Sequence, residues 1–97
     1  MNTLSDIPNA FAETLKECIE EGPITQRELG KRLGISEQLL NDMKRGRRRC
    51  TAEHDLRLSR YFKTSQGFWL RLQTAHDIRQ ANATHGKTIE REVTPAA

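Results

Sequence analysis

The chain has 97 residues, of which 35% are hydrophobic and 30% charged, and its formal net charge is +3. This length suits one small domain and excludes a second folded one, and no run of residues approaches the roughly 20 consecutive apolar positions that span a bilayer. Residues 1–8 lack the basic start and apolar stretch of a secretory signal, and two cysteines are too few for a disulfide framework. We therefore expect a cytoplasmic protein with free thiols and no membrane association.

Charge is unevenly distributed along the chain. Residues 1–24 carry five acidic side chains and one basic side chain, whereas residues 25–51 carry eight basic and three acidic ones. The sequence therefore predicts an acidic region followed by a cationic one, and each suits an oppositely charged partner.

The first predicted helix covers residues 9–20. Phe11, Leu15, Cys18 and Ile19 recur there at intervals of three and four, which is the pattern of one apolar face. Gly22-Pro23 then ends the helix, because proline cannot continue it and glycine permits a turn.

A second helix begins at Thr25, and a third follows it closely. Thr25 and Glu28 have the spacing of a capping box, and Gly34 suits the left-handed conformation that ends a helix. Ser36 is a good N-cap for a third helix that extends to about Arg45, so the two helices have helix-turn-helix spacing. The core residues expected from these two helices are Leu29, Leu33, Leu40 and Met43.

Two further helices complete the predicted all-α fold of five helices. Thr51 can cap the fourth helix and Ser65 the fifth. Beyond residue 81 the helical period is lost, so we expect residues 82–97 to be a tail that forms a short edge strand or is disordered. Residues 1–81 then form one domain, with the helix-turn-helix at about 25–46. The predicted apolar stripes are Leu56, Ser59 and Phe62 in the fourth helix and Phe68, Leu72, Ala75 and Ile78 in the fifth.

The third helix has the polar outer face that a DNA major groove requires. The groove admits one helix, whose short polar side chains can read base edges. Gln38 and Asn41 lie on one face, and their amides can pair with adenine. Glu37 can accept from cytosine, and Ser36 stands at the end that enters the groove. We predict that these four residues read the bases of double-stranded DNA.

Cationic side chains around this helix predict contacts to the DNA backbone. Gln26 stands at the first turn of the second helix, where its amide and the helix N-terminus can hold a phosphate. The basic run after the third helix adds affinity without sequence information. The predicted phosphate contacts are Gln26, Arg27, Lys44, Arg45, Arg47 and Arg48.

The residues that carry this pattern resemble a known family. The run from Gln26 through Glu28-Leu29-Gly30, Leu33-Gly34-Ile35-Ser36 and Leu40 to Gly46 resembles the helix-turn-helix of lambda-repressor-like (Xre-type) regulators. Within that superfamily, Phe68-Trp69-Leu70-Arg71-Leu72-Gln73 followed by Ala75-His76-Asp77-Ile78 resembles HigA-type antitoxins. The resemblance extends over residues 9–95, and a helix-ending glycine is common in that family at the position of Lys63.

This resemblance implies a homodimeric repressor that binds a palindromic operator at its own promoter. It also implies neutralisation of a small basic HigB-like toxin, an RNase that cleaves messenger RNA on the ribosome. The acidic first helix is the face we expect to meet the toxin, through Glu13, Glu17 and Glu20. Trp69, Leu72 and His76 are the residues expected at the dimer interface, and for Trp69 a place in the tertiary core is the alternative.

No pattern supports catalysis, a cofactor or a metal site. His76 and His85 have no nucleophile or paired carboxylate at catalytic spacing, and Cys50 with His54 provides only two metal ligands. We therefore expect no enzyme activity. Two alternatives remain open, a stand-alone Xre-type repressor without a toxin and an adaptor whose helix-turn-helix no longer contacts DNA.

Overall fold

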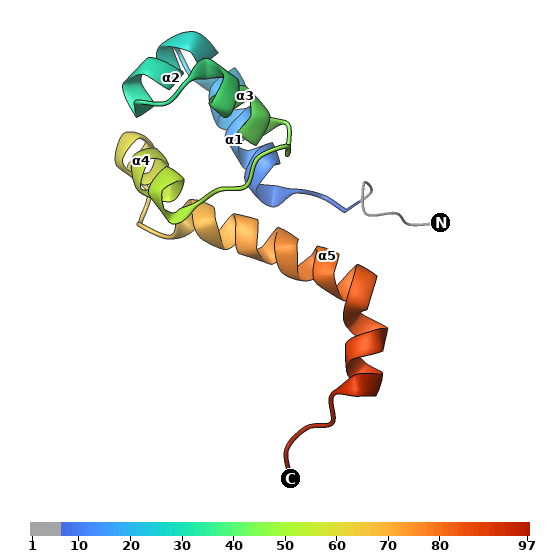
Figure 1. The fold of residues 1–97 in the computed structure, drawn as a ribbon. Coiled ribbons are helices and arrows are strands. Elements are labelled where there is room, and N and C mark those ends of the chain that lie inside the picture. Colours follow the sequence, from blue (N-terminus) through green and yellow to red (C-terminus); the bar gives the residue numbers. More distant parts are fainter. Residues whose placement is uncertain (1–6) are drawn as a thin grey trace.

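The computed structural model describes residues 7–97 and consists of five α-helices, with no strand among these residues. The first four helices gather at one end of the molecule, and the last leads away from them (Figure 1). The predicted all-α fold of five helices is confirmed. The helices are α1 (Ala10–Glu21), α2 (Gln26–Leu33), α3 (Glu37–Lys44), α4 (Ala52–Phe62) and α5 (Phe68–Glu92).

Four helices begin at a polar side chain that accepts a backbone N–H of the first turn, at 3.0 to 3.2 Å: Asn9, Thr25, Ser36 and Thr51. The predicted capping box at Thr25 is only half formed. The Glu28 carboxylate pairs with Arg32 Nε at 3.6 Å and does not accept the backbone N–H of Thr25. A full capping box instead begins α4, where His54 Nδ1 accepts the N–H of Thr51 at 3.2 Å. These caps fix where each helix starts.

The core lies where the packed faces of the helices meet. Trp69 of α5 is its largest buried side chain, and its ring meets Phe11 of α1 edge to face at a centroid distance of 6.3 Å. Burial of such apolar surface is the main favourable contribution to folding. The predicted core residues of the first three helices are buried, except Cys18, which is half-buried. The other buried apolar side chains are Ala12, Leu15, Ile19, Leu29, Leu33, Leu40, Met43, Cys50 and Leu58.

The buried faces of α4 and α5 differ from the prediction. Leu56 and Ile78 were predicted in the core and are 48% and 57% exposed. Ala75 is exposed as well, whereas Ser59 is buried as predicted. The prediction missed Asp55, Gln73 and His76, because these polar side chains occupy the core with internal hydrogen-bond partners. The buried residues of these helices are Asp55, Leu58 and Ser59 in α4 and Trp69, Gln73 and His76 in α5.

The connection between α4 and α5 also differs from the prediction. α4 ends at Lys63, which has φ 60, and α5 begins after Gly67 and not after Ser65. Gly67 has no side chain to cap α5, and Asp55 of α4 accepts backbone N–H groups of its first turn instead. Ser65 contributes its carbonyl, which accepts from Ser59 Oγ at 3.1 Å.

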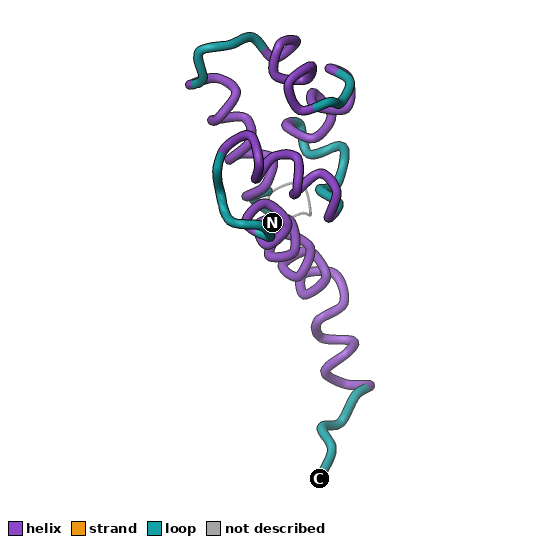
Figure 2. Tube along the Cα trace, turned by 90° about the vertical axis from the view of Figure 1, so that its left-hand side faces the viewer, coloured by secondary structure: helices purple, strands orange, loops and turns teal. Residues whose placement is uncertain are grey.

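α5 continues to Glu92 and projects well beyond the other helices (Figures 1 and 2). The prediction of a strand or disordered tail from residue 82 is therefore wrong for residues 82–92. Every residue of the segment 81–92, which we call the far half of α5, is exposed except Gly86. With no buried face, this segment has no apolar period for sequence analysis to detect. None of the helices in the described part of the chain is both long and apolar enough to cross a membrane.

Candidate nucleic-acid interface

α2 and α3 are joined by a tight turn. Gly34 in this turn has φ 73, and the N–H of Ile35 donates to the carbonyl of Gly30 at 3.0 Å. Glycine adopts this left-handed conformation without steric cost. Gly30 permits the close approach, since a Cβ there would lie 3.2 Å from the Ile35 carbonyl oxygen. The turn therefore fixes the direction of α3 relative to α2.

The outer face of α3 is polar and open to solvent. Glu37 and Gln38 are exposed on its first turn, and Asn41 is half-buried one turn later. Ser36 is exposed at the N-terminal end, but its hydroxyl oxygen already accepts the N–H of Leu39 at 3.0 Å. The four residues predicted to read bases thus lie together, and Ser36 has its O–H left to donate to a ligand.

Hydrogen bonds between side chains orient three of the predicted contact residues. Gln26 Nε2 donates to Asn41 Oδ1 at 3.4 Å, which links the first turn of α2 to the middle of α3. Gln38 Nε2 donates to Asp42 Oδ1 at 3.0 Å. Asp42 was missed in the sequence, although its position four residues after Gln38 on a helix is the signal that could have identified it. These bonds restrict the side-chain conformations and so reduce the ordering cost of binding.

Cationic side chains surround α3, as the charge distribution predicts. The segment after α3, residues 46–50, is called the arginine loop below. It begins at Gly46, which has φ 76, and the N–H of Arg47 donates to the carbonyl of Asp42 at 2.8 Å. Arg49 differs from the other two arginines of the loop, because its guanidinium pairs with Asp77 of α5. Among the predicted phosphate contacts, Arg27, Arg45, Arg47 and Arg48 are exposed, and Gln26 and Lys44 are half-buried.

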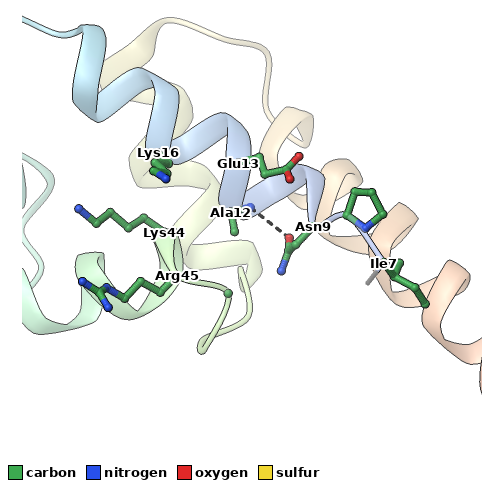
Figure 3. A pocket seen from close by; sticks show the side chains of 9 residues that line it. Ile7, Asn9, Ala12, Glu13, Lys16, Lys44 and Arg45 are labelled. Carbon is green, nitrogen blue, oxygen red and sulfur yellow. Dashed lines mark hydrogen bonds between the residues drawn. The ribbon is translucent and has the colours of Figure 1, made fainter. Parts of the chain in front are cut away.

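A cleft of about 640 Å³ lies between the N-terminal end of α1 and the C-terminal end of α3 (Figure 3). Lys16 of α1 lines this cleft together with Lys44 and Arg45. None of these three cations forms a salt bridge within residues 7–97. Lys16 was missed in the sequence because it is the single basic side chain of an acidic segment. Only its position beside α3 in space identifies it.

The acidic surface predicted on the first helix is exposed on α1. Glu13, Glu17 and Glu20 are spaced by four and three residues, so they share one side of the helix. Figure 3 shows the carboxylate of Glu13 directed away from Lys44 and Arg45. α1 therefore presents an accessible row of carboxylates, of which Glu13 also lines the cleft.

The residues expected at the dimer interface lie mostly in the core. Trp69 is 1% exposed, and its ring also contacts that of Phe62 in a tilted arrangement with centroids 5.5 Å apart, so it is not available to a partner subunit. His76 is 8% exposed, and its Nδ1 lies 3.2 Å from the carbonyl oxygen of Pro8. Leu72 is half-buried against the core. The exposed large apolar side chains of α5 and the following residue are Ile78, Ile89 and Val93.

Both cysteines are thiols with a raised pKa. Burial, followed by the nearby Asp55 carboxylate, raises the pKa of the Cys50 thiol to about 12. Burial, with a smaller contribution from Glu17, also raises the pKa of Cys18. His54 is engaged in the cap of α4, and residues 7–97 contain no group of three side chains that could hold a metal ion.

The chain is similar in sequence to known helix-turn-helix proteins. The family model HTH_3, described as helix-turn-helix, matches residues 15–65. Virulence-associated protein I from Dichelobacter nodosus is 35% identical over 66 residues, which are 68% of this chain. The chain matches 61% of that relative's length, less than two thirds of it.

Solved structures match along nearly the whole chain. An addiction module antidote protein of the HigA family from Coxiella burnetii is 38% identical, with a TM-score of 0.84, and the match covers 92% of this chain and 98% of that one. Pseudomonas aeruginosa antitoxin HigA, solved with the higBA promoter, is 36% identical, with a TM-score of 0.85 and coverage of 93% and 99%. Antitoxin GraA in complex with its operator is 34% identical, with a TM-score of 0.85 and coverage of 93% and 92%.

Proposed function

The chain belongs to the Xre-type helix-turn-helix family and, within it, to the HigA antitoxins, and from this membership we propose that it is a dimeric operator-binding repressor that also neutralises a small basic toxin. The observation that carries the DNA-binding part is the polar outer face of α3, which has cationic side chains at the cleft beside α1 and in the arginine loop that follows it. A helix with these properties fits the major groove of double-stranded DNA.

The proposed contacts divide into two groups with different effects. Side chains on α3 read base edges, and cations around it hold the phosphate backbone. Lys16 joins the second group, because it lines the same cleft as Lys44 and Arg45. The proposed base-reading residues are Ser36, Glu37, Gln38 and Asn41. The proposed phosphate contacts are Lys16, Gln26, Arg27, Lys44, Arg45, Arg47 and Arg48.

Footprinting and titration on the DNA upstream of the chain's own gene test the repressor proposal. A dimer with two recognition helices about 34 Å apart predicts two symmetric protected half-sites one helical turn apart. A single asymmetric site occupied by one chain would contradict the dimer. A binding affinity that does not change with salt would contradict DNA binding through phosphate contacts, since these release counterions.

We propose that the dimer contact is formed by the exposed apolar side of α5 and not by Trp69. Ile78, which precedes the far half, and Ile89, which lies within it, are both exposed, and their separation of eleven residues brings them to nearly the same side of the helix. Two such helices can bury these side chains against each other. Ile89→Glu should then give a monomer in sedimentation equilibrium, while the neighbouring exposed Thr88→Glu should leave the dimer intact.

We propose residues 1–81 as the DNA-binding domain and residues 82–97 as an appended segment. The packing supports this boundary, because the core ends at His76 and the far half of α5 is exposed. A chain ending at residue 81 should unfold cooperatively and bind a single half-site. Loss of cooperative unfolding in that variant would place the boundary further along α5.

The acidic face of α1 is the proposed docking surface for the toxin. Glu13, Glu17 and Glu20 can attract a basic protein and accelerate its association. The small open reading frame next to the gene should arrest growth when expressed alone, and co-expression of this chain should restore growth and give a complex that co-purifies. Triple replacement of these carboxylates by Gln should weaken rescue more than Glu90→Gln with Glu92→Gln does. Absence of both toxicity and a complex would leave a repressor without a toxin.

A further inference from the structure

A buried side chain of α5 holds the arginine loop in place. Gln73 is 3% exposed, and its Oε1 accepts the backbone N–H of Cys50 at 3.0 Å. The other end of the same amide, Nε2, donates to Asp77 Oδ1 at 2.9 Å. The second carboxylate oxygen of Asp77 pairs with the guanidinium of Arg49. Cys50 and Arg49 are consecutive in the loop, so α5 binds this segment both through its backbone and through a side chain.

The arginine loop is anchored at its other end as well. The N–H of Arg47 donates to the carbonyl of Asp42 near the end of α3. Arg48 lies between the two anchors, and it and Arg47 remain exposed. A loop held at both ends has lost most of its backbone freedom during folding, so it loses little more when it binds a ligand.

We propose that Gln73 and Asp77 are positioning residues for DNA binding. They present Arg47 and Arg48 on a fixed backbone, and they withdraw Arg49 from the cations that bind phosphate. This inference rests on the proposed operator binding, and it assigns a role in that binding to two α5 residues that lie outside the helix-turn-helix. It also explains why the polar side chain of Gln73 is buried in the core, where its amide makes both hydrogen bonds of the anchor.

The two consequences act on specific and non-specific DNA binding in opposite directions. Loss of the anchor disorders the loop and weakens the operator complex, which depends on one fixed geometry. Release of Arg49, together with loss of the Asp77 charge, strengthens attraction to any duplex. Asp77→Asn should therefore lower the ratio of operator affinity to random-duplex affinity by about 5- to 10-fold, which is the size of effect expected from the loss of one ordinary hydrogen bond.

The matched control is Glu90→Gln on the far half of α5. It removes one negative charge from the same helix at an exposed position remote from the loop. The control should raise operator and random-duplex affinity alike and leave their ratio unchanged. If Asp77→Asn behaves as the control does, its effect is one of net charge alone and the positioning role is wrong.

A double-mutant cycle on Arg49→Ala and Asp77→Asn tests whether the two residues act as a pair. If they do, the double variant should show no greater loss of the affinity ratio than Arg49→Ala alone. Losses that simply add would overturn the proposal, because each residue would then act on DNA independently.

A measurement without DNA separates this inference from the proposed function. Gln73→Met keeps the side-chain volume but removes both hydrogen bonds, so amide hydrogen exchange at Cys50 should accelerate at least about 10-fold, while exchange in α1 stays unchanged. Unchanged exchange at Cys50 would overturn the anchor. If the wild-type chain does not distinguish its operator from random duplex, the proposed repressor function is wrong. The DNA-binding role of the anchor is then wrong too, although accelerated exchange at Cys50 would still show that Gln73 anchors the loop.

Discussion

The carboxylate of Asp55 on α4 accepts the backbone N–H of Trp69 on α5, with 2.9 Å between Oδ1 and the nitrogen. The same carboxylate accepts the N–H groups of Leu70 at 3.0 Å and Gly67 at 2.6 Å. It is therefore the N-terminal cap of α5, supplied from another helix. A negative charge at a helix N-terminus is favourable, and here it also fixes how α5 crosses α4.

Replacement of Asp55 should be among the most destabilising polar substitutions in the chain. Asp55→Ala leaves three backbone N–H groups without their acceptor in a buried place, and we expect a loss of about 2 to 3 kcal/mol in the free energy of unfolding. Urea denaturation measures this loss. The control Glu53→Gln removes an exposed charge whose pairing with Arg57 is worth little. A similar small effect at both positions would contradict the capping role.

Lys63→Gly should stabilise the protein. Lys63 ends α4 with φ 60, a left-handed conformation that side chains other than glycine adopt at a steric cost. Glycine removes this cost, but it also raises the conformational entropy of the unfolded chain, which offsets part of the stabilisation. We expect a net increase of about 0.5 to 1 kcal/mol in the free energy of unfolding. Thermal unfolding checks the increase, and Lys63→Ala, which keeps the Cβ, should not reproduce it.

Substitutions on α3 should separate base reading from phosphate binding. Gln38→Ala and Asn41→Ala should each cost about 1 to 3 kcal/mol on the operator and little on random duplex, because base contacts exist only on the correct sequence. Arg47→Ala should weaken binding to both DNAs alike. Equal losses on both DNAs for all three variants, measured by fluorescence anisotropy, would show that α3 reads no bases.

Lys16→Ala should reduce the salt dependence of DNA binding. If Lys16 contacts one phosphate from the cleft beside Lys44, its loss should lower the slope of log affinity against log salt by about 0.9. Lys87→Ala on the far half of α5 provides the control, with no change in slope expected. An unchanged slope for Lys16→Ala would remove the cleft from the DNA interface.

Because the pKa of the Cys50 thiol is raised, we expect the protein to lose stability at alkaline pH. Its pKa is about 12 in the folded chain against 9.0 for an ordinary cysteine, so the unfolded state loses its proton first as pH rises. The stability contributed by the protonated thiol is complete below pH 9 and is lost progressively toward pH 12. Wild type should lose roughly 1 kcal/mol more than Cys50→Ala between pH 8 and pH 10 in urea denaturation. Equal losses in the two proteins would contradict the raised pKa.

Much of this molecule can be predicted from local signals in the sequence. Thr25, Ser36 and Gly34 define the helix-turn-helix because capping and left-handed turns depend on residues a few positions apart. The residues that the sequence analysis missed depend on contacts between positions far apart in the chain. Asp55 and Gln73 are polar side chains in the core, and their hydrogen-bond partners lie 14 and 23 residues away. Lys16 was missed for the same reason, since its neighbours in the cleft come from α3.

In the proposed dimer, the exposed far half of α5 would make the lifetime of the chain depend on the second subunit. A helical segment of this length without tertiary contacts is marginal in water, so it opens locally without unfolding the domain. Proteases cleave such open segments first, and a second subunit that covers Ile78 and Ile89 would close this route. Dilution of the protein should therefore shorten its survival in limited proteolysis, with the first cuts after residue 81.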